Sequence, residues 1–183
     1  MRRRRRAFLT VGVLLVLQMV PSPVAGQKES AGEYELKAAM LYNLTNFVDW
    51  PVSVYPDARK AIFLCILGQD ALGDSLTSTI VNRPGSVRSV SIRHLQGDKE
   101  FSGCQVLYIA SSERKTVIQI FSTVRNSGVL TVGEMTQFAA HGGMIQFSLE
   151  DQRIRFDINL GAASLSGLRI SSRLLALAHI VTN

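Results

Sequence analysis

The sequence holds few residues whose types and spacing could do chemistry. Its histidines are His94, His141 and His179, and none stands at metal-ligand spacing from another histidine or a cysteine, so we expect no metal site. The adjacent acids Glu150 and Asp151 fit a solvated turn. The chain contains no GxSxG nucleophile motif, no phosphate-binding loop and no dinucleotide fingerprint. We therefore predict that the protein is not an enzyme and uses no cofactor.

One enzymatic alternative stays open, because catalytic groups can come from distant segments of a chain. An exported enzyme would need a cleft that unites a histidine with Glu134 or Asp157. The glycine-containing turn at 68–73 is a poor phosphate site, since Asp70 and Asp74 place negative charge where a phosphate would lie.

The N-terminus has the order of a secretory signal peptide. Arg2–Arg6 are five consecutive cations, Ala7–Val20 is an almost unbroken apolar stretch, and Pro21–Gly26 is small and turn-prone. The apolar stretch is shorter than the roughly 20 residues that span a bilayer. We predict that residues 1–26 are removed and that 27–183 form one exported domain. An uncleaved anchor is the alternative, and the Sec and twin-arginine export routes both remain open.

Removing the signal changes the charge of the protein. The whole chain has 20 Lys and Arg against 14 Asp and Glu. Loss of the five leader arginines leaves fifteen cations against fourteen acids, a net charge of +1. No basic stripe interleaved with aromatic residues remains, so we expect no nucleic-acid partner.

The two cysteines, Cys65 and Cys104, allow a single pairing. In an oxidising compartment an even count favours a disulfide. The alternative is two buried thiols, since Cys65 lies inside an apolar strand pattern. That setting raises the pKa of a thiol and argues against a nucleophilic cysteine.

Two hydrophobic periods alternate along the chain, and each predicts one kind of element. Helical spacing predicts helices at Glu33–Trp50, Ala71–Val81 and Ser111–Val124, a helical turn at Gly133–Glu134, and a closing helix after Ser171 with Leu174, Ala178 and Val181 on its core side. Apolar runs and alternation predict strands at Ala61–Leu67, Val87–Leu95, Gln105–Ala110, Val129–Val132, Met144–Leu149 and Ile154–Leu160. This order predicts an α/β fold: a mostly parallel sheet flanked by helices on both faces, with a C-terminal β-hairpin and closing helix.

The C-terminal third carries the densest polar chemistry. Polar and apolar residues alternate along Arg153–Leu160, and Gly161–Gly167 reads as a small-residue loop. Arg169, Ser171 and Arg173 lie around the start of the expected closing helix, where guanidinium groups, hydroxyls and free backbone N–H groups could bind an anionic ligand. The alternative is an ordinary helix N-cap.

Two segments carry a family resemblance. The first includes Lys37-Ala38-Ala39, Leu41-Tyr42-Asn43 and Trp50-Pro51, and the second includes Gly142-Gly143-Met144-Ile145-Gln146-Phe147, Arg153–Leu160 and Ile170-Ser171-Ser172. The stretch Leu130–Glu134 adds to them. Together they resemble the YfiR family, small periplasmic proteins of Gram-negative bacteria.

The resemblance implies a non-catalytic periplasmic regulator that forms a homodimer. Such a protein binds the periplasmic domain of an inner-membrane diguanylate cyclase and represses it, which lowers cyclic-di-GMP and biofilm formation. An outer-membrane, peptidoglycan-associated lipoprotein is the further partner that the resemblance implies. Cys65 and Cys104 match a disulfide pair of the family, whereas the second pair of some relatives has no counterpart here.

We predict that the partner contacts the C-terminal third, where apolar and polar residues mix beside the small-residue loop. The expected contact residues are Asp157, Asn159, Leu165, Leu168 and Ile170, with either leucine alternatively in the core. A different class of function is also open: a periplasmic small-molecule-binding sensor module that uses a cleft at the ends of the parallel strands.

Overall fold

The computed structural model describes residues 31–55, 57, 60–81, 89–97 and 101–182. The expected signal peptide, the start of the mature chain, and Val87 and Arg88 of one expected strand lie outside this part of the chain. No helix in the described residues is long and apolar enough to cross a membrane.

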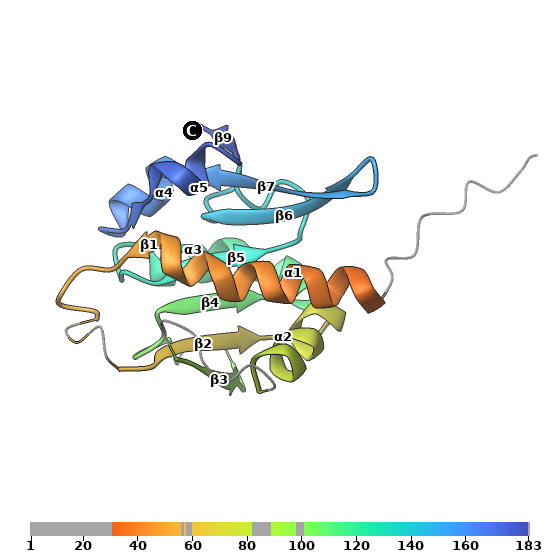
Figure 1. Cartoon of the computed structure of the whole chain (residues 1–183). Coiled ribbons are helices and arrows are strands. Elements are labelled where there is room, and N and C mark those ends of the chain that lie inside the picture. The colour runs from red at the N-terminus through yellow and green to blue at the C-terminus, as the bar shows by residue number, and fades with distance from the viewer. Residues whose placement is uncertain (1–30, 56, 58–59, 82–88, 98–100, 183) are drawn as a thin grey trace, which may run out of the picture.

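A central sheet organises the molecule (Figure 1). In the described residues it has seven strands in the order β3-β2-β4-β5-β6-β7-β9. The first five of these pair in parallel, β7 is antiparallel to β6, and β9 is parallel to β7. The mostly parallel α/β fold is therefore confirmed, with the expected hairpin at β6–β7. The bounds are β2 Ile62–Leu67, β3 Val90–Leu95, β4 Val106–Ile109, β5 Leu130–Gly133, β6 Ile145–Glu150, β7 Arg153–Asn159 and β9 His179–Val181.

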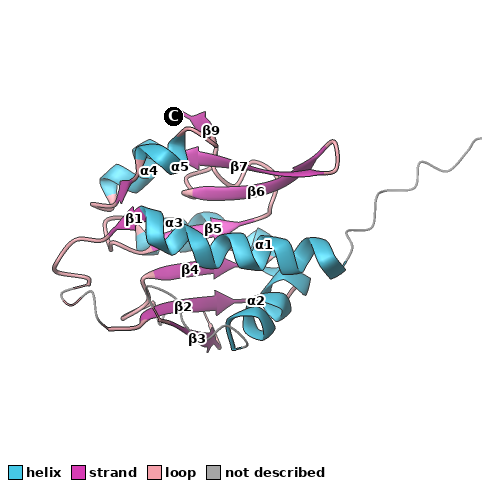
Figure 2. Cartoon of the chain, viewed as in Figure 1, coloured by secondary structure: helices cyan, strands magenta, loops and turns pink. Residues whose placement is uncertain are grey.

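Helices cover both faces of the sheet (Figure 2). On one face, α1 (Ala31–Leu44) and α2 (Ala71–Val81) pack with alternate strand residues into the larger core cluster. On the other face, the 3-10 helix η2 (Ser111–Lys115) leads into α3 (Val117–Val124), which packs into a second cluster. This second cluster includes residues of β2 and β4 but none of β6, β7 or β9 among those described. One face of the hairpin half of the sheet therefore has no helix of the described residues packed over it.

The first helix is shorter than its periodicity predicts. It ends at Leu44, and a 3-10 helix η1 (Thr45–Phe47) leads into a short strand β1 (Val48–Asp49). The hydroxyl of Thr45 donates to the carbonyl of Tyr42, a local bond that competes with helix continuation. Strand β1 then pairs antiparallel with β8 (Arg169–Ile170), which is the tertiary contact that overrides the helical pattern.

The C-terminal elements differ most from expectation. The segment read as a small-residue loop contains a helix, α4 (Leu160–Leu165). The closing helix α5 is a single turn (Ser172–Leu175), because residues 179–181 form β9 and pair with β7 instead. Likewise, the residues after Gly133 form turns rather than a helical turn.

Ser111 and Ser112 lie where a serine side chain could cap the start of a helix, but no such cap forms. The residue at the N-cap of η2 is Ala110, and it makes no side-chain capping bond. The Ser112 hydroxyl instead accepts a hydrogen bond from the backbone N–H of Gln69, 3.0 Å away. This contact ties the end of β4 to the end of β2 rather than capping the local helix.

The expected disulfide is confirmed. Cys65 lies in β2 and Cys104 lies just before β4, the neighbouring strand, with their Cα atoms 5.8 Å apart. Both side chains are buried under α3, in the second core cluster. The bridge therefore closes a 39-residue separation within the core.

Candidate functional site

Asn159, one of the expected contact residues, lies inside the protein and holds α4 in place. Its side chain is 2% exposed. The Oδ1 atom accepts a hydrogen bond from the N–H of Ala162 at 2.9 Å, which caps the start of α4. The Nδ2 atom donates to the carbonyl of Ala139 at 2.8 Å. Asn159 is therefore a structural residue that a partner protein cannot reach directly.

The two leucines of the expected contact surface have opposite environments. Leu165 ends α4 and is 64% exposed, whereas Leu168 is 3% exposed and belongs to the larger core cluster. Gly167, with φ of +72°, reverses the chain between them, and the N–H of Leu168 donates to the carbonyl of Ala163. Leu168 is thus a core residue, and Leu165 alone of the pair is available at the surface.

The remaining expected contacts lie on different sides of the sheet. Asp157 projects from the helix-free face of β7, because its neighbours Phe156 and Ile158 point into the larger core. Ile170 packs against that same core from β8 and is partly buried. The five residues therefore do not form one continuous surface.

The helix-free side of the hairpin offers a more coherent surface, which we call the open sheet face. It is defined by polar residues that alternate along β6 and β7 and by the adjoining start of β9. Arg155 lies opposite Ser148, Asp157 lies opposite Gln146, and His179 pairs with Asp157 from β9. The exposed Leu177 lies in the same depression as Arg155, Asp157 and His179. The accessible members of the open sheet face are Arg155, Asp157, Leu177 and His179, because the Ser148 hydroxyl is buried and the Gln146 side chain accepts a hydrogen bond from the N–H of Ala139.

The segment expected to bind an anion is short, and one of its backbone N–H groups is already engaged in a hydrogen bond within the protein. Arg169 and Arg173 are exposed, on β8 and α5 respectively. The N–H of Ser171 donates to the carbonyl of Phe47, so it is not free for a ligand. Helix α5 is a single turn, so little of a helix dipole develops at its start. An anion at Arg169, Ser171 and Arg173 stays a prediction.

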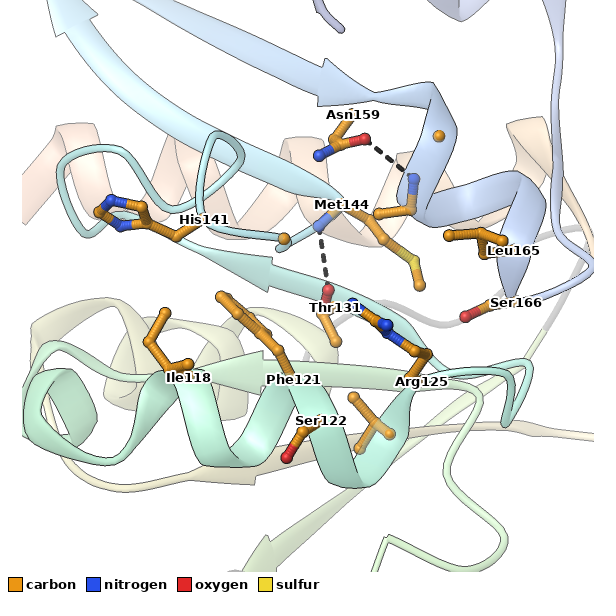
Figure 3. A pocket seen from close by; sticks show the side chains of 14 residues that line it. Ile118, Phe121, Ser122, Arg125, Thr131, His141, Met144, Asn159, Leu165 and Ser166 are labelled. Atoms are coloured by element: carbon orange, nitrogen blue, oxygen red, sulfur yellow. Dashed lines mark hydrogen bonds between the residues drawn. The ribbon is translucent and has the colours of Figure 1, made fainter. Parts of the chain in front are cut away.

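A cavity of about 290 Å³ lies between α3 and α4 (Figure 3). It opens at the amino ends of β5 and β6, where the N–H of Met144 donates to the Thr131 hydroxyl at 3.0 Å. Phe121 and Met144 form much of its apolar wall. Arg125, the residue that follows α3, and Ser166, the residue that follows α4, also line it. Sequence reasoning missed this site because α4 itself was not expected.

A buried ion cluster connects α1 to the turn after β5. The Lys37 ammonium is 2.8 Å from Glu33 and 2.5 Å from Glu134, and the Lys37 side chain is 1% exposed. The ring of Tyr34 lies beside it, with the Lys37 Nζ atom 5.5 Å from the ring centroid. A buried lysine is held charged by such carboxylates, and it fixes the helix relative to the strand end. Glu33 and Lys37 lie one helical turn apart on α1, whereas no local sequence pattern indicates that Glu134 joins them.

The carboxyl ends of the parallel strands, the usual ligand site of α/β folds, are largely occupied by internal contacts. Asp70 accepts hydrogen bonds from the N–H of Gly73, the N–H of Ser111 and the hydroxyl of Tyr108. Burial, and then the Asp70 carboxylate, hold the pKa of Tyr108 well above its usual range. Asp70 thus takes the position at the start of α2 that a phosphate would need. A polar, open depression of about 580 Å³ remains beside the ends of β2 and β3.

Comparison with known protein families shows which family the chain belongs to. A family model described as DUF4154, YfiR/HmsC-like, matches residues 34–179. The chain belongs to the YfiR/HmsC-like family. The match includes most of α1, the Lys37–Glu134 ion pair, the disulfide, and the open sheet face up to His179.

Solved structures with a similar fold are distant in sequence. One is an ABC domain in complex with L-Trp from Streptococcus pneumoniae, with a TM-score of 0.55 and 10% identity over 81% of this chain. Another is a conserved domain protein from Vibrio cholerae, with a TM-score of 0.56 and 11% identity over 82% of this chain. The chain spans 60% of the length of each. These likenesses show a shared fold.

One histidine does meet an acid, as the enzymatic alternative required. The Nδ1 atom of His179 is 3.2 Å from Oδ1 of Asp157. However, the His179 side chain is 77% exposed, and the depression around it is lined by no serine, threonine or cysteine that could act as a nucleophile. The described residues also contain no cluster of three or more His, Cys, Asp or Glu that could hold a metal. The pair is a polar feature of the open sheet face.

Proposed function

We propose that this protein is a periplasmic repressor that binds the periplasmic domain of an inner-membrane diguanylate cyclase and holds the enzyme inactive. The observation that carries the proposal is the YfiR/HmsC-like match across residues 34–179. The buried Cys65–Cys104 disulfide supports export, because such bridges persist in oxidising compartments. In this role the protein has no catalytic step of its own and lowers cyclic-di-GMP, and with it biofilm formation.

The proposed surface for the cyclase is the open sheet face together with Leu165 of α4. Its middle is polar, with Arg155, Asp157 and His179, and Leu177 and Leu165 are exposed by 74% and 64%. Leu177, beside this polar area, and Leu165, at the end of α4, each provide exposed apolar surface that a protein partner can bury. Asn159 and Leu168 are buried, so the proposed surface leaves them out.

Repression by binding has a thermodynamic limit. A repressor can shift its target toward the inactive form only by its differential affinity for the two forms. A shift from mostly active to mostly inactive, about 1:99 to 99:1, requires roughly 10⁴-fold tighter binding to the inactive form. Loss of the repressor must therefore raise cyclase activity, and loss of the cyclase must remove that effect.

The deciding experiment measures intracellular cyclic-di-GMP in three strains. Deletion of the gene for this protein should raise cyclic-di-GMP and surface attachment. Deletion of the cyclase gene as well should restore the low level. An unchanged level in the single deletion would contradict the repressor role.

A pair of matched variants tests the surface. Leu165→Asp should fail to lower cyclic-di-GMP when it complements the deletion, since it puts a charge in the proposed contact. Leu36→Asp, at a residue of α1 that is 54% exposed, should complement fully. Both variants should be present in the periplasm at the wild-type level. Full complementation by Leu165→Asp would remove α4 from the contact.

The proposal includes two further assemblies. The protein forms a homodimer, and an outer-membrane, peptidoglycan-associated lipoprotein sequesters it and so releases the cyclase. Light scattering of the purified mature chain should give twice the monomer mass. Overproduction of the lipoprotein should raise cyclic-di-GMP only in cells that contain both the repressor and the cyclase.

A small-molecule-binding module is the second candidate function. The cavity between α3 and α4 favours it, since ligand sites are concave and mostly apolar with a few polar groups. This candidate predicts that the gene deletion leaves cyclic-di-GMP unchanged while the purified protein still binds a ligand. The two functions are therefore separable by the same strains.

A further inference from the structure

The cavity between α3 and α4 contains a polar group that the folded chain leaves without a partner. Ser166 is 4% exposed, and its hydroxyl is buried and has no hydrogen-bond partner. Ser166 lines the cavity, and Figure 3 shows its hydroxyl pointing from the end of α4 toward the side where Arg125 lies. Buried hydroxyls are nearly always bonded in native proteins, and leaving one unsatisfied costs about 1–3 kcal/mol. A bound molecule is one way to satisfy it.

The charged residues around the cavity indicate whether the bound molecule is an anion or a cation. Arg125 is the only Lys or Arg among the fourteen residues that line the cavity, and none of these is Asp or Glu. Arg125 is exposed, and no carboxylate of the described residues forms a salt bridge with it. A guanidinium group binds a carboxylate through two parallel hydrogen bonds. One such group matches a single negative charge.

The walls of the cavity indicate the polarity and the size of the remaining part of the ligand. Phe121, Val124 and Met144 form an apolar interior, and the exposed side chains of Ile118 and Leu165 stand beside it. A ligand that covers these two removes apolar surface from water, which is favourable by about 25 cal/mol per Å². The volume of about 290 Å³ is at the low end for small-molecule sites, so the ligand is small.

We propose that this cavity binds a small monocarboxylate with an apolar body, such as a medium-chain aliphatic or an arylalkyl acid. The carboxylate pairs with Arg125, one of its oxygens accepts a hydrogen bond from Ser166, and the apolar body lies against Phe121 and Met144. Because the lining has no acid to hold an ammonium group, the site discriminates against amino acids of the same shape. The inference rests on the second candidate function, the small-molecule-binding module, and its test on the purified protein does not require the repressor role, although Leu165 belongs to both proposed surfaces.

Calorimetric titration of the purified protein, residues 27–183, with octanoate and with 3-phenylpropanoate tests the site. We expect saturable binding of at least one probe in a 1:1 ratio. Phenylalanine, which is 3-phenylpropanoate with an added ammonium group, should bind at least about tenfold more weakly, as should octylamine relative to octanoate. Absence of saturable binding by both carboxylates at millimolar concentration would overturn the proposal.

Single substitutions then test whether the side chains of Arg125 and Ser166 contribute to binding. Arg125→Gln should weaken binding by about tenfold or more, since it removes a charge-assisted pair, and Ser166→Ala should weaken it by a smaller factor. Arg114→Gln, which removes an exposed cation of η2 outside the cavity, should leave the affinity unchanged. Equal affinity in Arg125→Gln and wild type would reject the site.

A measurement on the wild-type protein tests the site even if the variants fail to fold. In NMR spectra, the methyl signals of Met144 and Leu165 should shift as either acid is added. Signals of Leu36, on the far side of α1, should not move. Shifts confined to residues outside the cavity would also reject the proposal.

Discussion

Leu165 and Leu168 are separated by two residues, yet the first is 64% exposed and the second is 3% exposed. The positive φ of Gly167 turns the chain between them, so that α4 ends at the surface and Leu168 enters the core. The same residue type therefore has two roles here, and substitutions at the two positions should have different consequences for stability and for regulation.

Leu168→Ala should lower the free energy of unfolding by about 2–5 kcal/mol, because it removes buried apolar atoms and leaves a cavity. Leu165→Ala should change it by no more than about 0.5 kcal/mol, as is usual for an exposed residue. Urea unfolding followed by circular dichroism measures both values. Equal decreases in the free energy of unfolding for the two variants would show that Leu165 and Leu168 do not differ in burial as described.

Removal of the disulfide should lower stability by about 4 kcal/mol at most, from the loop-closure entropy of a 39-residue separation. The double variant Cys65→Ala with Cys104→Ala tests this without leaving a free thiol. Its unfolding midpoint should not respond to a reducing agent, whereas that of the wild type should fall. If the unfolding midpoint of the wild type were the same with and without the reducing agent, a stabilising role for the bridge would be contradicted.

Lys37→Met should be strongly destabilising, by about 3–5 kcal/mol, since it leaves the nearly buried carboxylates of Glu33 and Glu134 without their shared cation. Adding Glu134→Leu to that variant should recover part of the loss, because one of the two carboxylates that faced the ammonium is then removed. Lys115→Met, at an exposed cation, is the control and should have little effect. Thermal unfolding of the four proteins gives the comparison.

The raised pKa of Tyr108 predicts a loss of stability in alkali. Burial, and then the neighbouring Asp70 carboxylate, keep its phenol protonated in the folded protein beyond the usual tyrosine pKa of about 10. The unfolded chain loses this proton first, so the stabilisation is complete below pH 10 and declines as the pH rises above it. Tyr108→Phe should therefore flatten the fall of unfolding free energy between pH 10 and 11.5.

The matched control for that titration is Tyr55→Phe, at a tyrosine whose hydroxyl donates to the carbonyl of Lys60. It removes a tyrosine hydroxyl that makes no hydrogen bond to Asp70, and Tyr108→Phe should change the alkaline slope more than this control does. At neutral pH, Tyr108→Phe should itself cost about 1–3 kcal/mol, because the Asp70 carboxylate loses a hydrogen-bond donor. An unchanged slope in Tyr108→Phe would show that another group controls the alkaline transition.

The elements that the sequence predicted best are those with a strong local pattern. The apolar run at β2 and the helix α2 were located almost to the residue, since a doubly buried strand and an amphipathic helix differ in period. The end of α1 and the single turn of α5 were missed because β1 and β9 form by pairing with β8 and β7, which lie far away in the sequence or across the hairpin. Local periodicity contains no information about such pairing.

The site was harder to predict than the fold, for the same physical reason. Asn159 reads as one of several polar residues on a strand face, and only its position before α4 makes it a cap. Glu134 joins Lys37 across a separation that no helical spacing reveals. The cavity depends on where the end of α3 meets the end of α4, so its lining residues have no shared sequence signature.

The pairing of β1 with β8 joins positions 48 and 170, and β9 completes the sheet with residues 179–181. A nascent chain cannot form these contacts until residues 170 and 179–181 have left the ribosome. Contacts between such distant positions also slow folding, because long loops must close before the contact is made. The order of strands thus makes completion of the sheet, and of the pairing between β1 and β8, a late step in folding.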